Sequence, residues 1–427
     1  MKLTRLVLVV ALVTYSLDLS SQGVAKDVDQ QITIEGSIVD VQTNEAIPFA
    51  SVSVKGRSVG TISNVEGVFV FNIPREFQGE NLIVSCMGFD RVEIPIVSLQ
   101  PDGRLSIVLE PSTIELDEIS VSEEKLTANL IIEKVIRNIG TYYPTRLFEM
   151  KGYFREFKKV NGAYVSLKEA AVSIYDKKGN GSNNRNHQDE KVIIEEIRKS
   201  HEFYDHWLNE LSVFPSSYNE IAHLFIHNDL KYLKRMGLNQ NRLHYSWDTT
   251  IYQNKKPVYL VSVVEHPERK FYVSENFYIT QVVEHRHYDK EEDDWNITMV
   301  GDSLVQNIKS WKNNLYFREI EGKYYPLYMS EAYEVSLNHP ESGEVVYGTA
   351  YSSSELLISD VRTEDVEYPT EKDLIERKTL SKVSYTYNPD FWKNYNMIKL
   401  NPLDEKLVRD LERKLSLEQQ FRAGTDQ

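Results

Sequence analysis

The stretch from residue 32 to residue 97 constrains the fold most, because short β-branched runs alternate there with turn residues at close, even spacing. Val52 and Val54 alternate with polar neighbours before a turn at 55–57, and Val68 and Val70 alternate after a turn at 64–67. Period-two apolar residues bounded by Gly, Asn and Pro are typical of a small antiparallel sandwich. We expect this sandwich over residues 32–110, as a spacer or docking module rather than a catalyst.

The first 21 residues predict export. Lys2 and Arg5 form a basic start, residues 6–13 an unbroken apolar run, and residues 20–21 a small-residue exit. This is the pattern of a signal peptide, and the run is too short for a normal membrane span. An uncleaved membrane anchor is the alternative, because residues 20–21 do not form an A-x-A cleavage site. No later segment is apolar enough to span as a helix, so we expect an exported chain in the periplasm or at the outer-membrane periphery.

Charge and cysteine content limit the partners and the chemistry. Acidic residues outnumber basic ones by 64 to 49, which gives a net charge of −15. This charge disfavours nucleic acid and anionic membrane surfaces as primary partners. Cys86 is the only cysteine, so no intrachain disulfide is possible. Its strand context predicts a buried, inert thiol.

The sandwich is followed by an acidic linker over residues 111–125, with one short strand expected at 118–121. A helix should come next, with Thr127 as its N-cap and Gly140 as its C-cap. Its apolar face recurs at i, i+3, i+4, i+7, i+8 and i+11 and comprises Ala128, Ile131, Ile132, Val135, Ile136 and Ile139. We expect this helix to cover one face of a sheet.

Hairpin signals dominate the rest of the chain. Asn161-Gly162 predicts a hairpin between strands 148–160 and 163–176, and Glu321-Gly322 predicts one between 315–320 and 323–333. Further strands are expected at 257–264, 270–274, 278–288, 297–302, 334–337 and 345–352. A polar loop is expected at 177–190, and helices at 192–234, with breaks, and at 403–419.

Twisted antiparallel sheets of this many strands tend to curl. The predicted fold is therefore mostly β, with a small antiparallel β-sandwich followed by an α+β second domain over residues 126–402. In that domain a curved antiparallel sheet, or half-barrel, packs with helices on one side. Residues 403–427 form a C-terminal helix and tail.

Histidines supply the candidate metal ligands. His187 and Glu190 have the H-x-x-E spacing of a zinc site, but they lie in a loop of Asn, Gly and Arg with no third ligand. His285 and His287 share one face of a strand, and we expect His266 on a nearby strand. Exposed sheets often carry such pairs, so we interpret these residues as structural.

The other groups of candidate metal-binding or catalytic residues are supported even less by the sequence. His223 and His227 have a usable helical spacing but apolar neighbours, whereas His201 and His206 are poorly spaced for a metal. The acidic run at 291–294 lacks the spacing of a calcium loop. We find no nucleophile elbow, Walker loop or dinucleotide glycine pattern. We therefore assign no catalytic, cofactor-binding or metal residue, and no cofactor.

Four segments of the first domain carry a family resemblance: GSIVD at 36–40, IPFASVSVKG at 47–56, GTISNVEGVF at 60–69 and SCMGF at 85–89. They resemble the carboxypeptidase-regulatory-like domain of Bacteroidetes proteins, although Asn64 stands where that family usually has Asp. The resemblance implies a transthyretin-like accessory sandwich and no peptidase activity. The same module precedes the plug of TonB-dependent receptors, whose junction is similar to residues 116–121.

Residues 126–427 are similar to the remainder of short Bacteroidetes envelope proteins that bear this sandwich. The similarity rests on NPDFWKNYN at 388–396 and SLEQQF at 416–421. The meander at 270–288 is similar to the hairpins of lipoprotein-carrier (LolA-like) half-barrels. Such a half-barrel would imply an apolar concavity able to hold an acyl chain.

Together these patterns favour a non-enzymatic, exported cell-envelope protein. The sandwich would act as a docking module or a spacer, and the curved-sheet domain would bind a lipid, another amphiphile or an outer-membrane protein partner. One alternative is an accessory component of a TonB-dependent outer-membrane transport system. Another is a metal-dependent, carboxypeptidase-like hydrolase that uses His187, Glu190, His285 and His287.

Overall fold

The computed structural model describes residues 31–99, 104–113, 126–179, 190–204, 244–288, 297–300, 304–338, 345–370, 380–398 and 403–424, with residues 221, 224, 225, 230 and 233. The predicted signal peptide at 1–21 lies outside the described residues, as do most of the predicted linker and its strand at 118–121.

The first domain is a sandwich of two small sheets, as predicted. One sheet has the order β4-β1-β7 and the other the order β3-β2-β5-β6. The strands are β1 (Gln31–Asp40), β2 (Ser51–Val54), β3 (Gly60–Ile62), β4 (Val68–Pro74), β5 (Asn81–Ser85), β6 (Val92–Pro95) and β7 (Leu105–Leu109), with short 3₁₀ turns η1 (Arg75–Phe77) and η2 (Ile96–Ser98). The pairing is antiparallel except between β1 and β7, which run parallel. In β4, Phe69, Phe71 and Ile73 are buried, whereas Val68 and Val70 of the sequence pattern are only partly buried.

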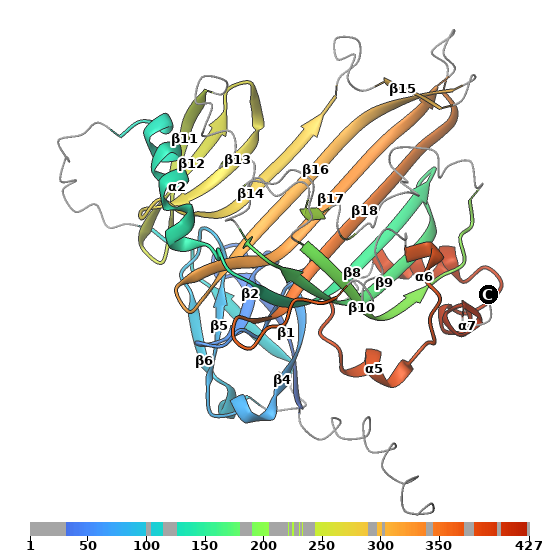
Figure 1. The fold of residues 1–427 in the computed structure, drawn as a ribbon, viewed down its shortest axis with the longest axis horizontal. Coiled ribbons are helices and arrows are strands. Elements are labelled where there is room, and N and C mark those ends of the chain that lie inside the picture. The colour runs from blue at the N-terminus through green and yellow to red at the C-terminus, as the bar shows by residue number, and fades with distance from the viewer. Residues whose placement is uncertain are drawn as a thin grey trace, which may run out of the picture.

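The second domain is built on one large, open, antiparallel sheet (Figure 1). Its order is β10-β9-β8-β18-β17-β16-β14-β13-β12-β11, and β15 pairs with β16 off this path. The strands are β8 (Phe148–Val160), β9 (Ala163–Asp176), β10 (Glu190–Lys199), β11 (Tyr245–Gln253), β12 (Lys256–Val263), β13 (His266–Ser274), β14 (Ile279–His287), β15 (Ile297–Val300), β16 (Leu304–Ile320), β17 (Lys323–Asn338) and β18 (Val345–Arg362). The predicted mostly β, curved-sheet architecture is confirmed.

Tight two-residue turns set the register of the long hairpins. Asn161-Gly162 and Glu321-Gly322 both have positive φ at each residue, between 50° and 76°, which is the primed turn that matches strand twist. These two predicted hairpins are confirmed. A third such turn, at Asn254-Lys255 with φ of 52° and 60°, joins β11 to β12. This turn was not predicted from the sequence, because it contains no glycine.

Four sequence predictions need correction. Residues 192–199 are strand, not helix, because their apolar positions also fit a strand once the bulge between Ile194 and Glu196 is included. Two strands are longer than predicted, since β17 includes the strand expected at 334–337 and β18 runs ten residues beyond its predicted end. The helix α2 (Ala128–Tyr142) starts at the predicted N-cap but passes Gly140 and ends at Tyr143.

The fourth correction concerns the C-terminal helix. It is two helices, α6 (Leu403–Leu411) and α7 (Leu417–Ala423), and they follow a third, α5 (Pro389–Asn394). Ser416 and Gln419 form a reciprocal capping box that starts α7. Such a box begins a new helix, so it separates α7 from α6.

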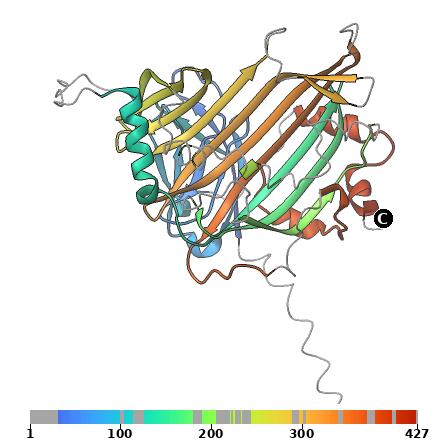
Figure 2. The ribbon, with the colours of Figure 1, turned by 45° about the horizontal axis from the view of Figure 1, so that its top comes forward.

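The large sheet is covered on both faces (Figure 2). We call the face that carries α2 the inner face, and the opposite face, which carries the sandwich and α5, the outer face. The 3₁₀ turn η8 (Leu380–Lys382) adds Leu380 to the core of the inner face. Helices α6 and α7 pack beside β9 and β10 at one end of the sheet.

An aromatic contact docks the sandwich on the outer face. The ring of Phe49 stacks on that of Tyr328, with centroids 5.4 Å apart, and meets Tyr316 edge-on at 6.1 Å. Phe49 has a φ of 56°, a left-handed conformation that is rare for a bulky residue. Such strain persists where surrounding contacts fix it, so the ring position defines this interface.

Polar contacts extend the same interface. Asn72 N–H donates to the Asn396 side chain at 2.7 Å, and the Asn396 amide donates back to the Asn72 carbonyl at 3.0 Å. The buried Arg318 guanidinium donates to the Ser58 carbonyl, and burial lowers its pKa to about 10 although Asp360 acts in the opposite direction. A Cβ at Gly60 would lie 1.5 Å from an Arg318 nitrogen, so only glycine fits there. The sandwich is therefore a fixed part of the molecule.

Replacing Phe49 with alanine should loosen this docking. We expect Phe49→Ala to lower the free energy of unfolding by about 2 kcal/mol, because a half-buried ring is removed, and to increase proteolytic cleavage between the two domains. Urea unfolding and limited proteolysis measure both effects. The control Val97→Ala removes a side chain that is 69% exposed on the sandwich and should change stability by less than about 0.5 kcal/mol. Equal behaviour of the two variants would contradict the interface.

Candidate functional site

The inner face of the large sheet carries one continuous apolar cluster. It takes buried side chains from β8, β9, β10, β12, β13, β14, β16, β17 and β18. Helix α2 contributes Ile131, Ile132, Val135 and Ile139, and Leu224, Phe225, Leu230 and Leu233 add helical side chains. The sequence left open whether this face is an open cavity. Among the described residues, the chain's own side chains fill it.

Tyr143 anchors the C-terminal end of α2 to the sheet. Its hydroxyl donates to the Ile279 carbonyl at 2.6 Å and accepts from the Ile279 N–H at 2.7 Å. The ring meets Phe317 edge-on at 5.4 Å. Burial raises the pKa of this phenol well above its ordinary value, so the hydroxyl stays a neutral donor and acceptor.

At two other positions on the inner face, buried charged side chains form ion pairs. Glu156 lies 3.1 Å from the Lys168 ammonium and 3.6 Å from that of Lys158, and all three residues are at most 3% exposed. Burial alone would raise the pKa of Glu156, but the two ammonium groups outweigh it and the pKa lies below its ordinary value. Farther along the sheet, the fully buried Glu284 accepts from Arg269 at 2.7 Å and from Arg286.

A polar cavity of about 600 Å³ lies at the β10 edge of the sheet. Lys199 closes that edge, since its ammonium donates to the carbonyls of Leu380, Ser381 and Val383 at 2.9–3.2 Å. The lining residues are Lys168, Lys199, Ser200, His201, Glu202, Phe203, Ser381, Lys382, Val383, Ser384, Tyr385, Gln420 and Gly424. The lining combines lysine, serine and histidine side chains with the apolar surfaces of Phe203, Val383 and Tyr385.

A second buried network, on the outer face, holds α5. Glu169 accepts from Arg198 Nε at 2.6 Å and from the Tyr153 hydroxyl. The Arg198 guanidinium lies 4.5 Å from the centre of the Trp392 ring, a cation–π contact that ties α5 to the sheet. Burial would raise the pKa of Glu169, but Arg198 holds it below its ordinary value. Trp392 belongs to the NPDFWKNYN segment, so that motif serves packing here.

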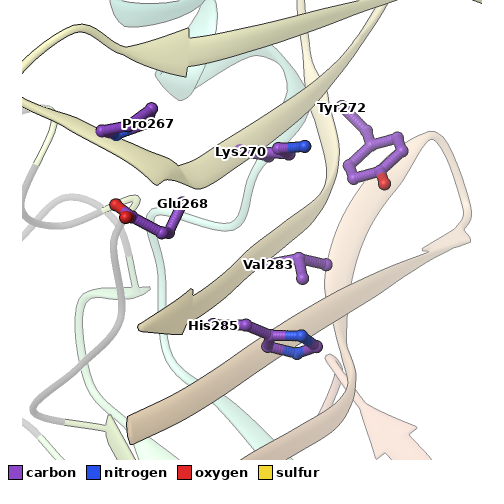
Figure 3. A pocket seen from close by; sticks show the side chains of 6 residues that line it. All are labelled: Pro267, Glu268, Lys270, Tyr272, Val283 and His285. Atoms are coloured by element: carbon purple, nitrogen blue, oxygen red, sulfur yellow. The ribbon is translucent and has the colours of Figure 1, made fainter. Parts of the chain in front are cut away.

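A smaller cavity of about 450 Å³ lies on the outer face of β13 and β14 (Figure 3). It is lined by Pro267, Glu268, Lys270, Tyr272, Val283 and His285. His285 Nε2 lies 3.1 Å from Asn314 Oδ1. Partial burial lowers the pKa of His285, so its imidazole is neutral at pH 7. One ammonium, one carboxylate, a phenol and an imidazole can hydrogen-bond a small polar molecule.

Only some of the candidate metal ligands lie in the described part of the chain, among them Glu190, His266, His285 and His287. His285 and His287 lie on β14 with the spacing predicted, and His266 opens β13. Among the described residues, no three His, Cys, Asp or Glu side chains gather where they could hold a metal ion. Glu190 opens β10 opposite Asp176. The other candidates, His187, His206, His223, His227 and residues 291–294, lie outside the described residues.

Cys86 behaves as an inert thiol. Burial raises its pKa to about 11, so thiolate is scarce at neutral pH. The buried ion pairs were not predicted from the sequence, because the sequence does not show which charged side chains of a strand are buried and paired across the sheet. The one available signal was a charge within an apolar strand, such as Glu169 between Leu167 and Ala170.

Removing the charge of Glu169 should destabilise the fold. We expect Glu169→Gln to cost on the order of 3 kcal/mol at pH 7, because the buried Arg198 loses its counter-charge. The native pKa lies below the ordinary 4.5, so this contribution is complete above pH 4.5 and is lost as pH falls through the native value. Urea unfolding from pH 7 to pH 3 measures it. Glu133→Gln, at an exposed pair with Arg137, is the matched control, and equal losses in both variants would contradict the assignment.

Comparisons with known proteins support the first domain's resemblance. Residues 34–121 match the family model of the CarboxypepD_reg-like domain. A stretch of 92 residues is 34% identical to the TonB-dependent receptor SusC of Bacteroides thetaiotaomicron, covering 22% of this chain and 8% of that receptor. Among the described residues, no helix has the length and apolarity needed to cross a membrane.

Similar solved structures are distant. A LolA superfamily protein from Nitrosomonas europaea aligns at 13% identity over 57% of this chain and 96% of that chain, with a TM-score of 0.21. A putative outer membrane lipoprotein-sorting protein domain from Vibrio parahaemolyticus aligns at 8% identity over 58% and 96%, with a TM-score of 0.23. Residues 34–121 are therefore similar to the CarboxypepD_reg-like domain by sequence.

Proposed function

We propose that this chain is a non-enzymatic, exported cell-envelope protein that binds an amphiphile on the inner face of its curved sheet. The observation that carries the proposal is the inner apolar cluster. Among the described residues, it spans nine strands and is covered by α2, by the helical residues 221, 224, 225, 230 and 233, and by Leu380 and Val383, rather than by a second sheet. A cover of this kind is a separate element that can move away while the sheet stays intact.

Among the described residues, several hydrogen bonds hold α2 along its length. The Tyr143 hydroxyl bonds to Ile279, the Asn138 side chain donates to the Asn276 carbonyl at 3.1 Å, and the Asn129 side chain accepts from Tyr245 N–H at 3.2 Å. The Lys323 ammonium donates to the Gly140 and Thr141 carbonyls at 3.2 and 2.6 Å. Tyr142 packs against Tyr278, Lys134 lies over the Phe277 ring, and apolar contact holds the rest of the helix. An acyl chain in its place would recover about 0.8 kcal/mol per buried CH₂, so exchange between helix and ligand is energetically feasible.

The buried charges of the described residues support a binding role. Glu156, Glu169 and Glu284 are each committed to lysine or arginine partners. Groups arranged in this way hold strands and helices together, whereas a catalytic acid or base has to face its substrate. The docked sandwich would act as the module that contacts another envelope component.

Crosslinking α2 to the sheet tests the proposal directly. In a Cys86→Ser background, Asn138→Cys with Asn276→Cys places a reducible bond between α2 and the turn before β14. We expect the reduced protein to bind a palmitoyl lysophospholipid at about one per chain in native mass spectrometry, and the oxidised protein to bind at least tenfold less, because α2 cannot leave the inner face.

The single variant Asn138→Cys in the same background is the control, and its binding should not respond to oxidant. Equal binding by the locked and unlocked forms would place the lipid elsewhere. No binding by the reduced form would remove the amphiphile from the proposal.

A second candidate function is supported by the 34% identity of 92 residues to a TonB-dependent receptor. In this case the chain would be an accessory of an outer-membrane transport system, with the sandwich as its contact module. We expect a tagged chain to co-purify with a TonB-dependent receptor from detergent-solubilised envelopes, and Phe49→Ala to reduce the yield. Recovery of the tagged chain alone, from envelopes that contain the receptor, would contradict this role.

A further inference from the structure

The polar cavity at the β10 edge adjoins the inner apolar cluster. Val383 is 7% exposed, belongs to that cluster and also lines the cavity. Tyr385 packs against the cluster and lines the cavity as well. On the strand side, Lys168 of the lining lies on the same face of β9 as Ala170, a member of the cluster. An apolar and a polar surface therefore meet on one side of the sheet.

Cationic side chains outnumber acidic ones in the lining of this cavity. Among the described residues that line it, Glu202 supplies the one carboxylate, which accepts from Ser381 Oγ at 3.0 Å. The same carboxylate lies 3.7 Å from the Lys168 ammonium. The lining contains three ammonium groups, those of Lys168, Lys199 and Lys382.

The sheet holds the charge of Lys168 in place. Lys168 is 2% exposed, and its ammonium lies 3.1 Å from a Glu156 oxygen. Lys158 is equally buried and lies 3.6 Å from the same oxygen. Glu156 and Lys158 add one charge of each sign behind the lining, so the excess of positive charge remains. Charges fixed away from water attract an anion more strongly than charges in bulk solvent do.

Three polar side chains of the lining are open to a ligand. Among the described residues, the side chains of His201, Lys382 and Ser384 make no hydrogen bond or ion pair. Lys382 and Ser384 are exposed, and His201 is partly buried. An ammonium, an imidazole and a hydroxyl can all donate hydrogen bonds to phosphate or carboxylate oxygens. The lining therefore offers an oxyanion both positive charge and free donors.

We propose that this cavity binds the head group of an anionic amphiphile, a phosphate- or carboxylate-bearing lipid whose acyl chain lies on the inner face. The inference rests on the proposed function, because it names the class of amphiphile that the inner face takes. The cavity volume of about 600 Å³ is typical of small-molecule sites. The apolar surfaces of Phe203, Val383 and Tyr385 can contact the glycerol and the first methylene groups beside the head group.

One lipid molecule is long enough to join the two surfaces. Helix α2 contacts β17, and four strand spacings separate β17 from β10. At about 4.8 Å each, these spacings add up to about 19 Å. A lipid extends over half of a bilayer, about 20 Å with its head group. A head group in the cavity therefore leaves the acyl chain long enough to reach the part of the inner face that α2 covers.

The net charge of the chain favours one bound lipid over attachment to a membrane. A charge of −15 repels an extended anionic surface. A single head group inside the cavity interacts mainly with the charges that line it, because salt screens charges that lie more than about 10 Å away.

Two lysophospholipids with the same palmitoyl chain test the proposal, one with an anionic phosphoglycerol head group and one with a zwitterionic phosphocholine head group. Isothermal titration calorimetry of the full mature chain measures both affinities, at low ionic strength and below the micelle concentration of each lipid. We expect the anionic lipid to bind at least tenfold more tightly, because only its head group brings a net negative charge into the cavity.

Two variants with the same change of net charge assign this preference to the cavity. Lys382→Gln removes an exposed ammonium from the lining and should lower the ratio of the two affinities at least threefold. Lys312→Gln removes an exposed ammonium from β16 on the outer face and should leave the ratio unchanged. Because both side chains are exposed, neither substitution removes a buried contact.

The possible results separate this inference from the proposed function. Equal affinities for the two lipids would overturn the head-group assignment and leave amphiphile binding intact, whereas binding of neither lipid would remove both. Equal loss of the ratio in the two variants would assign the preference to net charge, against the proposal. Inorganic phosphate should compete with the anionic lipid at least a hundredfold more weakly, because it has no acyl chain. Phosphate binding as tight as that of the lipid would make this a site for free anions instead.

Discussion

Covering both faces of one open sheet is the constraint on which the structure depends. An antiparallel sheet with this many strands has a large apolar face that must leave water, and it does not close on itself to do so. Here α2 and short helical segments cover the inner face, while the sandwich and α5 cover the outer face. The second domain therefore has two cores, and the first domain is part of the cover for one of them.

The outer cover is joined to buried charges by a chain of contacts. Phe49 stacks on Tyr328, the Tyr328 hydroxyl donates to Glu355 at 3.0 Å, and Glu355 pairs with Arg155. Breaking such a buried ion pair costs more free energy than the pair contributes relative to apolar side chains of similar size. These pairs therefore fix one arrangement of the two domains more than they add to stability. Among the described residues, α2 on the inner face is held by hydrogen bonds from Lys323, Asn138 and Tyr143 and by apolar and aromatic contact, without a buried ion pair. This difference is why we locate ligand exchange on the inner face.

Local signals in the sequence predicted much of the fold. Asn161-Gly162 and Glu321-Gly322 gave two hairpins because their turn type depends on those residues alone. The strand at 190–199 was missed because its apolar spacing fits a helix as well, and only pairing with β9 decides between them. The full lengths of β16, β17 and β18 were missed because serine-rich stretches, such as residues 352–354, are strand only through their neighbours. The left-handed Phe49 has no sequence signal, since contacts with a distant domain hold it.

The candidate sites were less predictable than the fold, because they depend on residues brought together over long separations, such as Arg198 with Trp392. The most direct test of the central claim is native mass spectrometry of the mature chain purified from cell envelopes, followed by organic extraction. Our account predicts a retained amphiphile at about one per chain, released on extraction. A mass equal to that of the polypeptide alone, unchanged after incubation with excess lysophospholipid, would contradict it.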